Sequence, residues 1–132
     1  MSAGGKLLDM AKSAAALAAQ WHALVEQHAR VTIALERALA EHDLGISEFE
    51  VLAELASAPE NECRMQQLSG TVHLSQSALS RVVGRLEEQG LVSRFMCKDD
   101  RRGIFAALTP AGRERYELAR PTHGRVLAQN LG

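Results

Sequence analysis

The stretch from Leu74 to Val92 carries two kinds of side chain at helical spacing. Its apolar residues recur at i, i+3, i+4 and i+7, which predicts one buried stripe of a helix. They are Leu79, Val82, Val83 and Leu86. The opposite face carries hydrogen-bonding side chains and has no acidic residue before Glu87; these are Gln76, Ser77, Ser80, Arg81 and Arg85. Short hydroxyl and amide groups beside guanidinium groups can bond phosphates and base edges, so the pattern predicts a helix that approaches an anionic surface closely.

A hairpin is predicted directly after this helix. Gly90 ends the helix, and strands are predicted at 91–97 and 104–108, joined by the charged turn 98–103. Thr109 and Pro110 then provide an N-cap and a first helical residue. A basic-faced helix joined to a two-stranded hairpin predicts a winged helix-turn-helix, in a mainly α (α+β) fold.

The elements before this lobe follow from periodicity and from helix breakers. A long helix is predicted from Lys6 to about Glu41, roughly 50 Å at 1.5 Å per residue. This length exceeds what one small lobe needs, which suggests packing against a second subunit. Gly45 breaks the chain, and the spacing Ser47-x-x-Glu50 predicts a capping box for the next helix.

Three further local signals complete the lobe and its flank. A short helix is predicted at 65–72, and His73-Leu74 form the turn into a helix capped by Ser75. A last helix is predicted from Pro110 to about Ala128, with a kink at Pro121. We therefore expect one domain over 1–132, with a DNA-binding lobe at 44–109 flanked by dimerisation helices at 6–43 and 110–132.

Charge is segregated along the chain. The formal net charge is −1, yet residues 64–103 hold seven basic against four acidic residues, a net +3. Residues 41–62 hold seven acidic residues and no Lys or Arg. Phosphate contacts need local positive charge, not a basic pI, so the basic half fits a nucleic-acid surface and the acidic stretch is expected to face away from it.

Composition favours an ordinary globular chain. Apolar residues make up 46% of the 132 residues, and no window reaches the 18 apolar residues of a membrane span. The N-terminus lacks the basic and then apolar run of a signal peptide, and two cysteines, Cys63 and Cys97, do not make a disulfide framework. A cytoplasmic protein is expected.

Three motifs in the same order resemble the MarR-type (multiple antibiotic resistance) transcriptional regulators. They are Ser77-x-x-Ser80-Arg81-x-x-x-Arg85-Leu86-Glu87-x-x-Gly90-Leu91-Val92, Asp100-Arg101-Arg102, and Leu108-Thr109-x-x-Gly112. The resemblance runs roughly from Leu44 to Arg120, without an insertion or deletion between the motifs.

The resemblance implies a homodimer that binds near-palindromic double-stranded DNA. It places the 75–89 helix in the major groove, with Gln76 suited to adenine and Arg81 or Arg85 to guanine or phosphate. At the wing, Asp100 orients Arg102 toward the minor groove, and Arg101 contacts phosphate. The full set of expected DNA-binding residues is Arg64, Ser75, Gln76, Ser77, Ser80, Arg81, Arg85, Asp100, Arg101 and Arg102.

Three features depart from the family pattern. Gly84 stands where an acidic or polar residue is usual, and a glycine inside a helix costs about 1 kcal/mol in helix propensity. Cys97 replaces the acidic residue common at the start of the wing. These regulators usually continue into a further helix beyond the point where Gly132 stands, and the sequence leaves open how the dimer is completed.

The family often carries a sensor, and the sequence offers two. A small anionic or phenolic effector is expected near Trp21, His22 and His28, at a junction with the acidic second helix. In the alternative interpretation, Trp21 is a core residue, and each histidine is a surface or core residue that binds no ligand. A redox sensor would use Cys63 and Cys97, although neither lies in a thiolate-stabilising motif. No CxxC or HxxxH spacing predicts a metal site, and no cofactor is expected.

Two other classes of function compete with DNA binding. An enzyme needs a nucleophile with a base, paired carboxylates or a phosphate loop, and the sequence offers none of these patterns. A winged helix that binds only protein usually loses its arginines at the helix face and wing tip, and this chain keeps both. The sequence therefore predicts a sequence-specific DNA-binding transcriptional regulator, a repressor relieved by a small-molecule effector.

Overall fold

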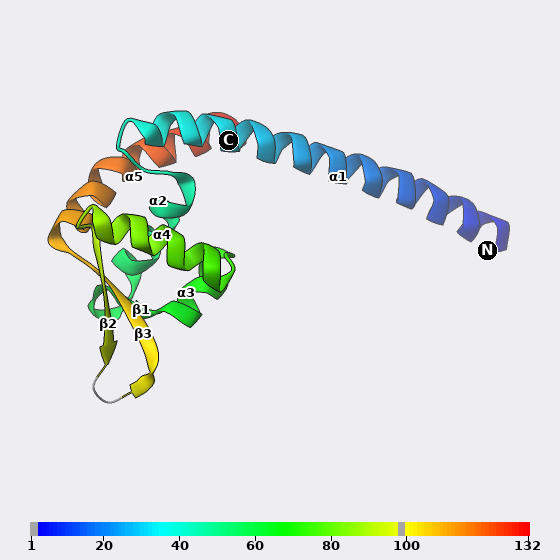
Figure 1. Cartoon of the computed structure of the whole chain (residues 1–132). Helices are drawn as coiled ribbons and strands as arrows, with labels where there is room; N and C mark the ends of the chain where they lie inside the picture. The colour runs from blue at the N-terminus through cyan, green and yellow to red at the C-terminus, as the bar shows by residue number, and fades with distance from the viewer. Residues whose placement is uncertain (1–2, 98–99) are drawn as a thin grey trace.

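The computed structural model describes residues 3–97 and 100–132, and side chains over 13–96 and 103–132. Nine elements follow one another along the chain: α1 (Ala3–Ala40), α2 (Ile46–Ser57), a 3-10 turn η1 (Pro59–Asn61), β1 (Glu62–Arg64), α3 (Met65–Val72), α4 (Gln76–Glu88), β2 (Val92–Cys97), β3 (Asp100–Leu108) and α5 (Pro110–Leu131). Figure 1 shows a lobe built from α2 to β3, with α1 and α5 side by side along one edge.

Helix α1 extends far beyond the lobe. Its 38 residues span about 57 Å at 1.5 Å per residue. Among the side chains described from residue 13 on, the buried ones are Leu35 and Leu39, in the C-terminal part of the helix, which packs on α5 and α2. The N-terminal part projects away from the lobe with no other element beside it (Figure 1). The predicted long helix is confirmed.

Helix α2 begins two residues earlier than its predicted capping box. Gly45 is the N-cap, and its backbone N–H donates to Glu48 Oε1 at 3.2 Å. The predicted Ser47–Glu50 box is therefore wrong. Leu44 is buried, which fixes where the chain turns into the helix and sets the frame at 45–48. The buried face includes Phe49 and Leu52, as the spacing predicts.

The helix-turn-helix forms as the local signals predict. Helix α3 ends at His73, which has the left-handed φ of 57° that ends a helix. Ser75 then caps α4, because its Oγ accepts a hydrogen bond from the N–H of Ala78 at 3.1 Å. The predicted stripe of α4 is fully within the core: Leu79, Val82, Val83 and Leu86 are at most 5% exposed.

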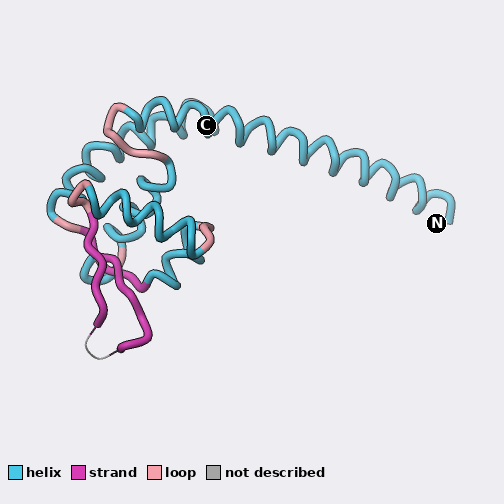
Figure 2. The backbone as a smooth tube through the Cα atoms, viewed as in Figure 1, coloured by secondary structure: helices cyan, strands magenta, loops and turns pink. Residues whose placement is uncertain are grey.

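The predicted two-stranded wing is present as β2 and β3, and a third antiparallel strand that was not predicted, β1, joins it in one sheet. β3 lies in the centre, between β2 and β1 (Figure 2). β1 pairs Glu62 with Ala107 and Arg64 with Phe105. The second wing strand also starts earlier than predicted, at Asp100 in place of Ile104. β1 ties the segment before α3 to the base of the wing, so the helix-turn-helix and the hairpin share one sheet.

The start of α5 is fixed against the turn that follows α4. The Thr109 hydroxyl accepts from the Gly112 N–H at 3.0 Å and donates to the Gly90 carbonyl at 2.7 Å. The Thr109 N–H donates to the Leu91 carbonyl at 3.1 Å. The predicted cap is confirmed. α5 continues through Pro121 as one helix to Leu131.

No helix in residues 3–97 or 100–132 has an apolar stretch of the length needed to cross a bilayer.

Candidate DNA-reading surface

The outer face of α4 is the candidate site. Its apolar stripe lies in the core, which leaves Gln76, Ser77, Ser80, Arg81 and Arg85 exposed on the other side. The first turn is held by the cap, and the Ser75 and Ser77 hydroxyl oxygens lie 3.4 Å apart. Five of the residues predicted to contact DNA thus share one solvent-facing surface.

The two arginines of α4 differ in their surroundings. Arg81 makes no hydrogen bond or ion pair with the described side chains, so its five N–H groups face solvent. Arg85 lies further along the helix, with its Nε 3.9 Å from Glu48 Oε1. Glu48 is one of the acidic residues expected to face away from the basic surface. Its side chain is only 12% exposed and lies against the C-terminal half of α4, where it attenuates the charge of Arg85.

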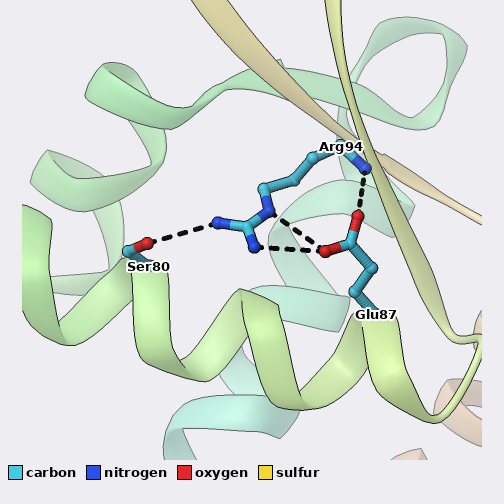
Figure 3. Close-up of polar contacts among 3 residues, drawn as sticks. All are labelled: Ser80, Glu87 and Arg94. Carbon is cyan, nitrogen blue, oxygen red and sulfur yellow. Dashed lines mark hydrogen bonds and ion pairs between the residues drawn. The ribbon is translucent and has the colours of Figure 1, made fainter.

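Arg94 is a residue that the sequence interpretation missed. It comes from β2 and reaches over the outer face of α4 (Figure 3). Its Nε and Nη2 donate to Glu87 Oε1 at 3.3 and 3.1 Å, and its Nη1 donates to Ser80 Oγ at 3.2 Å. Ser80 therefore already has a partner in the free protein. One signal was present in the sequence: Gly84 leaves a gap on this face, four residues after Ser80 and three before Glu87.

Arg64 lies where α3, α4 and the wing meet. Its guanidinium is 5.5 Å from the centre of the Phe105 ring, a cation–π distance. It contributes to a hollow of about 310 Å³. The hollow is lined by Arg64, Met65, Gln66, Gln76, Gly103 and Ile104. The structure thus brings Arg64, before α3, and Gln76, at the start of α4, to one depression at the base of the wing.

The predicted wing-tip residues fall outside the described side chains. The backbone places Asp100, Arg101 and Arg102 at the start of β3, next to the end of β2. Their side chains, and that of Cys97, lie outside the described residues. The predicted orientation of Arg102 by Asp100 therefore stays a prediction.

The predicted effector residues lie on the projecting part of α1. Trp21 is 63% exposed, and with Leu24, Val25 and His28 it lines a mostly apolar hollow of about 450 Å³. His22 is exposed outside this hollow. In the single chain these residues do not contact α2, so the expected junction with the second helix is wrong: the part of α1 that packs on the lobe begins only around Val31.

Cys63 lies on β1 in an environment that disfavours its thiolate. Burial, and then the charge of Glu54, raise the pKa of the Cys63 thiol above its ordinary value. Since the thiolate is the reactive form, the thiol is less reactive at neutral pH than in an unfolded chain. This argues against the redox alternative for Cys63.

We expect alkylation of Cys63 to be slow. In a Cys97→Ser variant, the rate of reaction with iodoacetamide should rise with pH through a midpoint above that of the urea-unfolded chain. Glu54→Gln should move this midpoint down, because it removes the second cause of the shift. A midpoint in the folded chain at or below that of the unfolded chain would contradict the assignment.

A helix-turn-helix with an exposed polar and basic second helix, followed by a β-hairpin and flanked by two long helices, defines the winged helix-turn-helix class of DNA-binding proteins. The MarR family model matches residues 44–104. AbsC, a MarR family transcriptional regulator from Streptomyces coelicolor, is 31% identical with a TM-score of 0.81, over 85% of this chain and 76% of that one. The chain belongs to the MarR family.

Two other solved structures are similar over most of this chain. Sco3205, a MarR family transcriptional regulator from Streptomyces coelicolor solved in complex with DNA, is 32% identical with a TM-score of 0.80, over 83% of this chain and 69% of that one. CouR from Rhodococcus jostii RHA1, solved with p-coumaroyl-CoA, is 26% identical with a TM-score of 0.73, over 80% and 73%. The predicted fold class and the predicted family are therefore confirmed, and the chain is a DNA-binding transcriptional regulator.

Proposed function

We propose that this protein represses transcription as a homodimer, by binding a near-palindromic site in double-stranded DNA. The observation that carries the proposal is the outer face of α4, which is polar and basic, exposed, and backed by a fully buried stripe. Two such helices related by a two-fold axis would enter successive major grooves about one helical turn apart. Residues 44–109 form the DNA-binding lobe in this proposal.

The roles of the side chains follow from their chemistry. Gln76, Ser77, Ser80 and Arg81 read base edges or position the helix on phosphates, and Ser75 holds the first turn. Arg85 and Arg64 contribute positive charge at the two sides of this surface. At the wing tip, Arg102, oriented by Asp100, enters the minor groove, and Arg101 contacts phosphate.

Selection of duplexes from a random library by the full chain tests the proposal. We expect an enriched motif with two related half-sites, bound in a salt-dependent way because phosphate contacts release counterions. Retention of random and selected duplexes with equal affinity, or of neither, would contradict sequence-specific recognition and favour the alternative, a winged helix that binds protein.

The flanking helices, 6–43 and 110–132, form the dimer interface in this proposal. The projecting part of α1 leaves Leu17, Trp21, Leu24 and Val25 between 46% and 63% exposed. Such an apolar strip on an otherwise isolated helix is stabilised by burial against a second copy of the chain.

We expect the double variant Trp21→Glu/Leu24→Glu to be monomeric at micromolar concentration. Two carboxylates would have to be buried without partners if the same strip were covered. Sedimentation equilibrium measures the change, and Gln20→Glu, an exposed position on the same helix, is the control that should stay dimeric. A double variant that sediments as a dimer would place the interface elsewhere.

A small anionic or phenolic effector that releases the DNA is part of the proposal. CouR, solved with p-coumaroyl-CoA, supports it as a relative that binds an aromatic acyl group. The apolar hollow with Trp21 and His28, closed by the second subunit, is the candidate pocket, and His22 stands beside it. An effector that quenches Trp21 fluorescence while it releases DNA is the expected observation; release by that effector from a Trp21→Phe variant with unchanged affinity would place the pocket elsewhere.

The remaining parts of the proposal concern chemistry and location. The protein acts by binding alone, without catalysis, and it acts in the cytoplasm, where its DNA is. The described residues hold no group of three His, Cys, Asp or Glu side chains arranged for a metal ion. A cysteine-based sensor is the less favoured alternative, because the pKa of the Cys63 thiol is raised.

A further inference from the structure

Arg94 joins the wing to the recognition helix through a closed set of hydrogen bonds. Its own backbone N–H donates to Glu87 Oε2 at 3.2 Å, while its guanidinium donates twice to Glu87 Oε1. Glu87 thus binds both ends of the same residue. This fixes the direction in which the Arg94 side chain leaves β2, and it couples the strand to the last turns of α4 (Figure 3).

The second amino group of the Arg94 guanidinium reaches the middle of the DNA-reading face. Arg94 Nη1 donates to Ser80 Oγ at 3.2 Å, seven residues before Glu87 on α4. A guanidinium only donates hydrogen bonds, so Ser80 must accept here. Its hydroxyl proton is then left to donate outward, toward a phosphate oxygen or an acceptor on a base edge.

Gly84 makes room for this arrangement. It lies between Ser80 and Glu87 on the same face, and a Cβ there would be 3.8 Å from Arg94 Nη2. The Cβ alone would be in ordinary van der Waals contact with the guanidinium, and a side chain longer than that of alanine would extend into the space that Arg94 occupies. Gly84 therefore lowers the helix propensity of α4, and it also leaves the space in which the Arg94 side chain crosses the helix.

We propose that Arg94 is a positioning residue for DNA recognition: it fixes the wing relative to α4 and orients the Ser80 hydroxyl as a hydrogen-bond donor to DNA. The inference rests on the proposed function. Arg94 acts through Glu87 and Ser80, and its charge is already neutralised by Glu87, so it adds nothing to the counterions that DNA binding releases. Loss of the bridge should lower affinity at an unchanged salt slope.

The test is a variant that removes the bridge and keeps the net charge. Arg94→Met/Glu87→Gln in the full chain should bind the duplex selected by the wild type about ten-fold more weakly, the order of one lost base-edge contact. The slope of log affinity against log salt should stay the same. Loss of one phosphate contact would instead flatten this slope by about 0.9.

Three further variants separate positioning from a general structural role. Ser57→Ala removes an exposed side-chain hydrogen bond within the lobe but outside the DNA-reading surface, from Ser57 Oγ to the Ala53 carbonyl at 3.2 Å, and should bind as the wild type. Ser80→Ala should weaken binding in the wild type and have no further effect in the double variant, because Ser80 is no longer oriented there. Arg94→Lys, which keeps the charge but has one donor group in place of a fork, should lie between the wild type and the double variant.

A measurement without DNA completes the test. Amide hydrogen exchange in β2 and β3 of the free protein should become faster in Arg94→Met/Glu87→Gln and remain unchanged in Ser57→Ala. Wild-type affinity of the double variant, a changed salt slope, or unchanged exchange in the wing would overturn the inference. A wild type that selects no duplex would instead overturn the proposed function, and the exchange result would still decide whether Arg94 fixes the wing.

Discussion

Replacement of Gly112 by alanine should destabilise the fold by about 3 kcal/mol, the upper end of the usual cost of overpacking a core. A Cβ at position 112 would lie 2.0 Å from the Leu91 carbonyl oxygen and 2.8 Å from Leu108 Cδ1. The Leu91 carbonyl cannot move away cheaply, because it accepts the Thr109 N–H in the joint between α4, β2 and α5. The higher helix propensity of alanine, about 1 kcal/mol, is too small to compensate.

Urea unfolding of the full chain at one fixed protein concentration measures this effect, since the stability of a dimer depends on concentration. Gly70→Ala is the matched control. Gly70 is an exposed glycine of α3 with no atom within 4 Å of an added Cβ, so alanine there should stabilise by about 0.5–1 kcal/mol. Equal midpoints for Gly112→Ala and Gly70→Ala would mean that α5 can retreat from Leu91 without cost.

Local signals in the sequence were sufficient for the helix-turn-helix and for the start of α5. The stripe from Leu79 to Leu86 and the caps at Ser75 and Thr109 each act within one or two turns of helix, so they can be recognised from spacing alone. β1 could not be found in this way. Its three residues, Glu62–Arg64, form a strand only because they pair with Ala107–Phe105, more than forty residues later.

Two predictions failed for the same reason. In each, a local sequence pattern allowed more than one structure, and the tertiary contacts decided which one forms. The capping box could start at Gly45 or at Ser47, since each has a glutamate three residues later, and the burial of Leu44 selects the first. The apolar stripe around Trp21 predicted a covered face, but the sequence does not say which element covers it. In the single chain none of the described residues does: Trp21 is 63% exposed, and α1 meets the lobe only about ten residues further along, near Val31.

The candidate site was predicted residue by residue, but its internal contacts were not. The exposed side chains of α4 follow from helical periodicity. The bridge from Arg94 to Ser80 and Glu87 depends on how β2 returns over the helix, and periodicity does not report this geometry. The sequence therefore predicted Arg94 only as one positive charge, whereas the structure shows that its side chain bridges β2 and α4.

Arg81→Ala should cause the largest loss of DNA affinity among the single substitutions on α4. Arg81 is exposed in the middle of the outer face and makes no bond to the described side chains, so no contact within the protein compensates for its loss on DNA. Bidentate contact with a guanine predicts a cost of about 1–3 kcal/mol on the selected duplex and a relaxed preference at one base pair.

Titration of the selected duplex and of a random duplex, each over a series of salt concentrations, separates the two roles open to Arg81. A base contact predicts a larger loss on the selected duplex than on the random one. Equal losses on both, with a salt slope flatter by about 0.9, would mean that Arg81 touches only phosphate. Arg120→Ala on α5 removes the same charge outside the DNA-reading surface but within a proposed dimerisation helix, so it serves as the control once sedimentation has shown that it is still a dimer. Both of its affinities should then stay close to those of the wild type. If Arg81 reads a base, the centre of each half-site lies under the middle of α4. On one side of this point is the Ser80 hydroxyl, which Arg94 orients, and on the other is the hollow lined by Gln76 and Arg64.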